Sequence, residues 1–107
     1  MRKIKGTSNF KRDYRREKSG VHGKKLDALV TVIVNLLAAD KDLPSNAVDH
    51  ALVGKLAGYR DCHIKPDLIL IYRKTNDDVL ELVRLGSCSE LGDNSTVLLE
   101  CRGELSL

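Results

Sequence analysis

Two histidines and an arginine between residues 50 and 84 are suited to cutting RNA. These residues are His50, His63 and Arg84. RNA is cleaved when its own 2′-OH is deprotonated, the phosphorane charge is stabilised and the leaving 5′-oxygen is protonated. Histidine titrates closest to neutral pH, and arginine offers a fixed fork of donors to phosphate oxygens. No cluster of carboxylates accompanies these residues, so their types indicate a reaction that needs no metal.

The first half of the chain predicts a short strand and two helices. Residues 1–6 are compatible with a strand, and residues 7–9 (TSN) supply capping oxygens for a helix that ends near Lys18. A second helix is expected over 24–39, where apolar residues recur at i, i+3, i+4 and i+7. This apolar stripe is wide enough to pack on a sheet.

After a loop over 45–58, the hydrophobic period changes to two, which is typical of strands. Three strands of an antiparallel meander are expected over residues 59–64, 68–74 and 79–87. The middle strand is nearly all apolar and should be central. In the first strand, His63 shares a face with Asp61, and Cys62 lies on the other. The order of elements predicts an α+β fold, with two N-terminal helices packed on a small antiparallel sheet.

Composition narrows the class of protein. The 107 residues allow one domain, and no apolar run approaches the length of a transmembrane helix. No apolar stretch directly follows the basic N-terminus, as a signal peptide would require. The three cysteines show no CxxC spacing and form no zinc pattern with the histidines. We therefore expect a reduced cytoplasmic protein without a metal centre.

Positive charge is concentrated at the N-terminus. Residues 1–25 hold ten of the 18 Lys and Arg but two of the 15 Asp and Glu. A basic end suits a binder of polyanions, because neutralised phosphates release counterions. The alternative is a solvated helix face. The candidates for RNA contact are Lys11, Arg12, Arg15 and Arg16 on the first helix, with Arg60 and Arg73 as weaker ones.

A family resemblance is carried by residues 49–74 (DHALVGKLAGYRDCHIKPDLILIYRK) and 79–87 (VLELVRLGS). The combined pattern resembles the YafQ branch of the RelE superfamily of bacterial toxins. Its most telling members are Asp49-His50, Leu52, Gly58 to Asp61, His63, Pro66-Asp67, Ile69 to Tyr72, Arg84 and Gly86. The similarity predicts a toxin domain over 1–91. Residues 92–107 then form an extension, which is either a further strand or a disordered end.

The resemblance implies a fold of two helices on a small antiparallel sheet. It also implies a toxin that enters the ribosomal A site and cleaves mRNA there, which inhibits translation. No metal and no organic cofactor would be used. A cognate antitoxin would neutralise the toxin, and operator DNA would be contacted only through that antitoxin. No membrane partner is expected.

Four residues match family positions linked to catalysis. His50, in the loop before the sheet, is the candidate general base, and a plain surface histidine is the alternative. His63 also matches a catalytic position, although a half-buried strand histidine is the alternative. Asp67 matches an acidic residue that orients a histidine or helps proton transfer, with simple turn chemistry as its alternative. Arg84 matches the arginine that stabilises phosphate, whereas a lone strand arginine usually lies at the surface.

Cys88 and Gly92 depart from the family pattern. The family motif after the last strand reads Gly-Ser/Thr-His-Ser/Ala-x-Leu-Phe, whereas residues 86–92 read GSCSELG. Cys88 therefore stands in the catalytic set where the family has a histidine, and Gly92 replaces an aromatic residue. A cysteine with an ordinary pKa of about 8.5 is mostly neutral at pH 7 and cannot replace an imidazolium. We expect RNA cleavage to be attenuated.

Three other functions stay open. One is a catalytically weak module of the toxin fold, which mainly binds its antitoxin and supports autoregulation. Another is a toxin of the same fold that acts on a different machine such as DNA gyrase, although the histidine, aspartate and arginine set argues against it. The last is a plain RNA-binding domain. Three Tyr and one Phe offer little for stacking on single strands.

Overall fold

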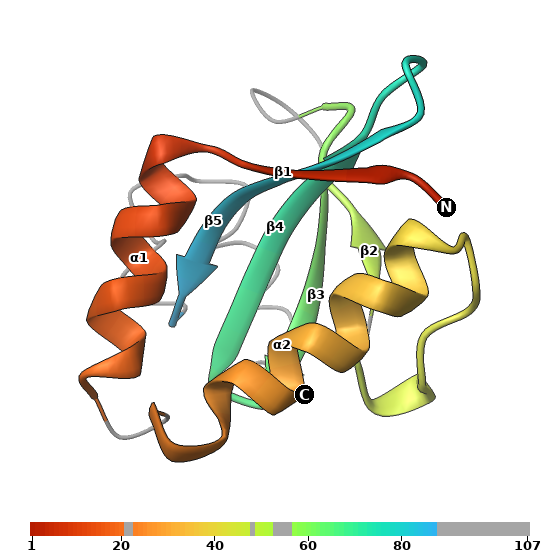
Figure 1. Ribbon diagram of the computed structural model, residues 1–107. Helices are drawn as coiled ribbons and strands as arrows, with labels where there is room; N and C mark the ends of the chain where they lie inside the picture. The colour runs from red at the N-terminus through yellow and green to blue at the C-terminus, as the bar shows by residue number, and fades with distance from the viewer. Residues whose placement is uncertain (21–22, 48, 53–56, 88–107) are drawn as a thin grey trace.

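The chain forms one sheet with two helices packed against it (Figure 1). The computed structural model describes residues 1–20, 23–47, 49–52 and 57–87, and within them the sheet has five strands. The elements are β1 (Lys3–Gly6), α1 (Ser8–Lys18), α2 (Gly23–Ala38), the 3₁₀ turn η1 (Ser45–Ala47), β2 (His50–Ala51), β3 (Arg60–Lys65), β4 (Leu68–Lys74) and β5 (Val79–Gly86). The strand order β1-β5-β4-β3-β2 places β4 at the centre, as predicted.

The sheet is mixed rather than wholly antiparallel. Strands β2 to β5 pair antiparallel, which confirms the predicted meander. Strand β1 runs parallel to β5, with Lys3 opposite Val79 and Gly6 opposite Leu82. Both helices and three strands separate β1 from β5 along the chain, so the connection is long enough for parallel pairing. A tight hairpin would have forced these two strands to be antiparallel.

Helix α1 begins where the sequence predicts. Thr7 caps it, because its Oγ1 accepts a hydrogen bond from the amide of Phe10 at 3.1 Å. The same hydroxyl donates to the carbonyl of Val83 at 3.0 Å. Strand β1 pairs with β5 only as far as Leu82, and α1 stands beside the continuation of β5 (Figure 1). The capping residue therefore also ties α1 to the edge of β5.

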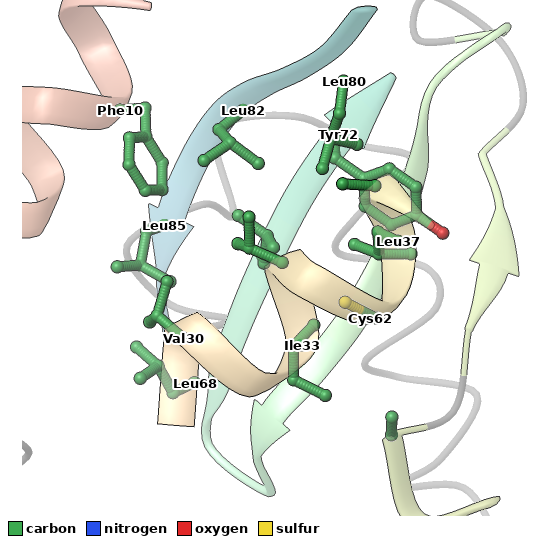
Figure 2. Packing of buried hydrophobic residues seen from close by; sticks show 14 of the residues in the cluster. Phe10, Val30, Ile33, Leu37, Cys62, Leu68, Tyr72, Leu80, Leu82 and Leu85 are labelled. Atoms are coloured by element: carbon green, nitrogen blue, oxygen red, sulfur yellow. The ribbon is translucent and has the colours of Figure 1, made fainter. Parts of the chain in front are cut away.

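The main hydrophobic core lies between α2 and one face of the sheet (Figure 2). Burial of the apolar stripe of α2 removes it from water and holds the helix against β3, β4 and β5. The core residues include Phe10, Leu26, Val30, Ile33, Leu37, Cys62, Leu68, Leu70, Tyr72, Leu80, Leu82 and Leu85. A smaller cluster formed by Leu52, Ile69 and Ile71 packs separately. We call the sheet face that carries this smaller cluster the open face.

The segment before β3 differs from the prediction. Residues 45–58 were expected to be a loop containing His50, but His50 lies in β2 and pairs with β3. The loop assignment of His50 was therefore wrong. Two residues are too few to produce a recognisable period-two pattern, which is why the sequence does not reveal this strand. Among the described residues, no helix has both the length and the apolar character needed to cross a membrane.

Candidate active site

Strand β2 places His50 beside a buried carboxylate on the open face. His50 and Asp61 are opposite one another across β2 and β3, so their side chains emerge on the same face. The Nδ1 of His50 lies 3.8 Å from Oδ1 of Asp61. The His50 side chain is 43% exposed, whereas that of Asp61 is 2% exposed. This geometry gives an accessible imidazole backed by a carboxylate that can orient it.

His63 lies on the same strand face as Asp61, two residues farther along β3, as the sequence predicts. It is buried, with 8% of its surface exposed. His63 and Pro66 also contribute to the wall of a cavity of about 270 Å³, which is bounded by α2 and η1 on its other sides. The described geometry therefore gives His63 far less contact with solvent than His50.

Asp67 and Arg84 occupy two different parts of the sheet. Asp67 is exposed in the turn between β3 and β4. Arg84 is paired in register with Ile71, which is itself the partner of Asp61. His50, Asp61, Ile71 and Arg84 thus form one row across four strands, and three strand spacings make this row about 14 Å wide. A short stretch of RNA backbone lying along this row would meet His50 at one end and Arg84 at the other.

A buried aspartate on α1 holds Arg84 in place. The Nε of Arg84 donates to Oδ2 of Asp13 at 2.6 Å, and the amide of Leu85 donates to the same oxygen at 3.0 Å. Arg16 donates from Nη1 to the other carboxylate oxygen at 3.1 Å. Asp13 is 0% exposed. No local pattern in the sequence indicates this role, because Asp13 is one acidic residue in a basic helix.

These contacts change the ionisation of Asp13. Burial by itself raises the pKa of the Asp13 carboxyl, because it penalises the charged form. The hydrogen bonds from Arg84 and from the Leu85 amide, together with the charges of Arg84 and Arg16, outweigh burial and hold this pKa below its ordinary value. Asp13 is therefore ionised at neutral pH and pairs with a cationic Arg84.

The proposed RNA-binding residues divide into two groups. Lys11, Arg12 and Arg15 are exposed on α1. The other three are bound within the protein, since Arg16 donates to the Leu85 carbonyl, Arg60 pairs with Asp49 and Arg73 pairs with Glu81. Arg73 also lies over the ring of Tyr59 at 5.0 Å. The first group is better placed for contact with a polyanion.

The last member of the predicted catalytic set, Cys88, lies outside the described residues, as does the extension over 92–107. The described part ends at Ser87, directly after β5. The residue before it, Gly86, is paired in register with Ile69, which in turn is the partner of His63.

Comparison of the sequence with known proteins identifies the family of this chain. The family model for the YafQ toxin of bacterial type II toxin–antitoxin systems matches residues 2–93. The chain belongs to this family. It is 44% identical over 69 residues to the mRNA interferase toxin YafQ of Escherichia coli, covering 63% of this chain and 68% of that one. The YafQ family thus accounts for both the fold and the residue pattern.

Two solved structures extend the comparison with the YafQ family. A metal-bound toxin from Helicobacter pylori is 38% identical, with a TM-score of 0.77 over 85% of this chain and 99% of that chain. The E. coli DinJ–YafQ toxin–antitoxin complex contains a chain that is 31% identical, with a TM-score of 0.72 over 84% of this chain and 96% of that one. This chain is therefore the toxin of a type II system by family.

The described residues do not fit a metal site. Within residues 1–20, 23–47, 49–52 and 57–87, no group of three or more His, Cys, Asp or Glu side chains could hold an ion. His50 and Asp61 supply two donors. A transition-metal site in a protein takes at least three protein ligands, so this pair falls short of one.

Proposed function

We propose that this toxin cleaves mRNA on the ribosome, in a metal-independent reaction carried by the open face. One observation carries the proposal: His50 is accessible to solvent and backed by the buried carboxylate of Asp61. Arg84 stands in the same row of the sheet and is held by Asp13. Relatives in the same family are named mRNA interferases. A toxin directed at DNA gyrase, the alternative, would not need these histidine, aspartate and arginine side chains.

The reaction needs one base, one acid and one cation. His50 takes the proton of the 2′-OH, and the 2′-oxygen then forms a bond to phosphorus. Asp61 stabilises the imidazolium that results. Arg84 donates hydrogen bonds to the phosphorane oxygens. The bond from phosphorus to the 5′-oxygen breaks, and His63 gives that oxygen a proton. The products are a 2′,3′-cyclic phosphate and a 5′-OH.

Cys88 is expected to weaken this reaction. Family members carry a histidine at the matching position, and a neutral thiol is a poor substitute for a cationic donor. The second candidate function is therefore a weak catalyst whose main activity is antitoxin binding and autoregulation. The solved DinJ–YafQ complexes support a cognate antitoxin as partner, and contact with operator DNA would pass through that antitoxin. Both functions would be exercised in the cytoplasm.

Helix α1 is the proposed contact with ribosomal RNA. Changing Arg12 and Arg15 together to Glu should weaken binding to purified ribosomes and lower the slope of log affinity against log salt by about 1–2. Both side chains are exposed, so the fold should persist. Arg16 is left intact because it bonds to the Leu85 carbonyl. Sedimentation with ribosomes over a series of salt concentrations measures the effect.

The control reverses the same amount of charge elsewhere. Lys3→Glu with Lys41→Glu changes two exposed residues, one on β1 and one in the segment after α2. This double variant should bind ribosomes almost as well as the unmodified chain. Equal weakening by both double variants would show that net charge, rather than the surface of α1, drives the association. In that case α1 is a solvated face.

A further inference from the structure

Asp49, the residue before His50, is anchored to the hydrophobic core. Its Oδ1 accepts a hydrogen bond from the hydroxyl of Tyr72 at 2.7 Å and another from Nε of Arg60 at 3.2 Å. Tyr72 belongs to the main core and is 1% exposed. Figure 2 shows its ring among the core side chains, with the hydroxyl oxygen projecting out of the cluster. A buried phenol thus reaches a carboxylate at the start of β2.

The side chains of Asp49 and of the candidate base, His50, point to opposite sides of the sheet. Successive residues of an extended chain face opposite ways. His50 stands on the open face beside Asp61, whereas Asp49 turns toward the core face and Tyr72. Asp49, which accepts the bond from the Tyr72 hydroxyl, is therefore the chain neighbour of His50, yet the sheet separates that hydroxyl from any RNA on the open face.

Strand β2 is a short edge strand, and Leu52, which follows it, is buried in the smaller cluster with Ile69 and Ile71. The strand consists of two residues, and its ladder with β3 continues through the amide of Leu52, which donates to the carbonyl of Tyr59 at 2.9 Å. An edge strand this short has marginal stability of its own. A hydrogen bond from a buried donor to a carboxylate is among the stronger ones in a protein. The Tyr72–Asp49 bond accordingly adds a strong polar tie at one end of β2, while the burial of Leu52 holds the other end.

We propose that Tyr72, acting through Asp49, is a positioning residue that holds His50 against Asp61. This inference rests on the proposed function only in giving His50 a catalytic role. Tyr72 does not touch the substrate, because it is buried on the other face. Burial and the hydrogen bond to Asp49 raise the pKa of Tyr72, so the hydroxyl keeps its proton and acts as a donor at neutral pH.

Tyr72→Phe deletes one oxygen and leaves the ring in the core. Amide exchange of Leu52 should accelerate by about tenfold, because β2 opens more often. The ring signals of His50 should shift in NMR spectra of the full chain. The amide of Thr7, which donates to the Leu82 carbonyl at the far side of the sheet, should exchange at an unchanged rate.

The matched control is Tyr14→Phe. It removes a phenol-to-carboxylate hydrogen bond elsewhere, since the hydroxyl of Tyr14 donates to Asp27. It should leave Leu52 and His50 unaltered. Asp49→Ala removes the bond from Tyr72 together with the one from Arg60, so its effects should be at least as large as those of Tyr72→Phe. The double variant should be no worse than Asp49→Ala alone, because the Tyr72–Asp49 bond is already absent from it. Asp49→Ala, on a partly exposed side chain, also decides the matter if Tyr72→Phe does not fold.

Two readouts separate this inference from the proposed function. Unchanged Leu52 exchange and unchanged His50 signals in Tyr72→Phe would overturn the positioning role, whatever the chain does to RNA. If the chain cleaves mRNA, Tyr72→Phe should lower kcat by about tenfold and leave KM unaltered, because substrate contacts stay in place. Absence of cleavage in every variant would count against the proposed function alone, since exchange and NMR would still report on His50.

Discussion

Replacing Asp13 with alanine is expected to lower the free energy of unfolding by about 2–4 kcal/mol. The substitution leaves the buried amide of Leu85 without its acceptor and separates Arg84 and Arg16 from their shared carboxylate. The two arginine side chains are 33% and 41% exposed and can turn to water, which keeps the cost below that of a fully buried pair. Urea denaturation followed by circular dichroism measures this loss of unfolding free energy.

Two further variants show where this effect comes from. Asp42→Ala removes an exposed aspartate and should change the free energy of unfolding by less than about 0.5 kcal/mol. Asp13→Asn keeps an acceptor for the Leu85 amide but removes the charge, so its cost should fall between those of the other two. If Asp13→Ala were as harmless as Asp42→Ala, α1 would not depend on this carboxylate to hold the edge of β5.

The Asp13 contribution should also depend on pH. The pKa of the Asp13 carboxyl in the folded state lies below its ordinary value of about 3.9, so its stabilising effect is fully present above that ordinary value. The effect is lost as the pH falls through the lower folded-state pKa. The difference in unfolding free energy between the unmodified chain and Asp13→Asn should therefore shrink below about pH 4. A difference that stayed constant there would contradict the assigned ionisation.

Changing Cys88 to histidine is expected to raise the rate of mRNA cleavage on programmed ribosomes by about 10²–10⁴. This is the usual contribution of a positioned acid or base. Family members carry histidine there, and the other candidate residues on the open face are present in this chain. Primer extension on a message with a defined A-site codon gives the rate and the position of the cut. Cys101→His adds the same side chain elsewhere in the C-terminal segment and should have no effect.

The other outcomes of this experiment are equally informative. Equal rates for the unmodified chain and for Cys88→His would contradict attenuation, and proton transfer would then be assigned to His50 and His63 alone. Absence of cleavage by both chains, at concentrations that bind ribosomes, would remove the nuclease proposal. The second candidate function, an antitoxin-binding module, would then be the better supported one.

Local sequence signals predict much of this fold. The cap at Thr7, the limits of β4 and the opposite faces of Cys62 and His63 all follow from patterns spanning a few residues. In each case the physical cause is local, since it is a side-chain oxygen near a helix start or a strand period of two. The helices and the meander were therefore accessible without a structure.

The contacts that hold the site together are long-range. Asp13 and Arg84 are 71 residues apart, and no periodicity connects them. Tyr72 reads as one more apolar residue of a central strand, although its hydroxyl binds Asp49. Asp61 becomes a partner of His50 only once β2 pairs with β3. The sequence indicates which side chains are candidates for the chemistry, whereas the contacts that support them arise only from tertiary pairing.

The most direct test of the central claim is to find which residues touch mRNA on the ribosome. Ribosomes carrying a message with 4-thiouridine in the A-site codon would be irradiated with the bound chain, and the adducts mapped by mass spectrometry. This readout does not need the chain to be an active nuclease. The account predicts adducts on β2 to β5, within residues 49–52, 60–74 and 79–87. Adducts confined to α2, or none above the level with naked mRNA, would contradict it.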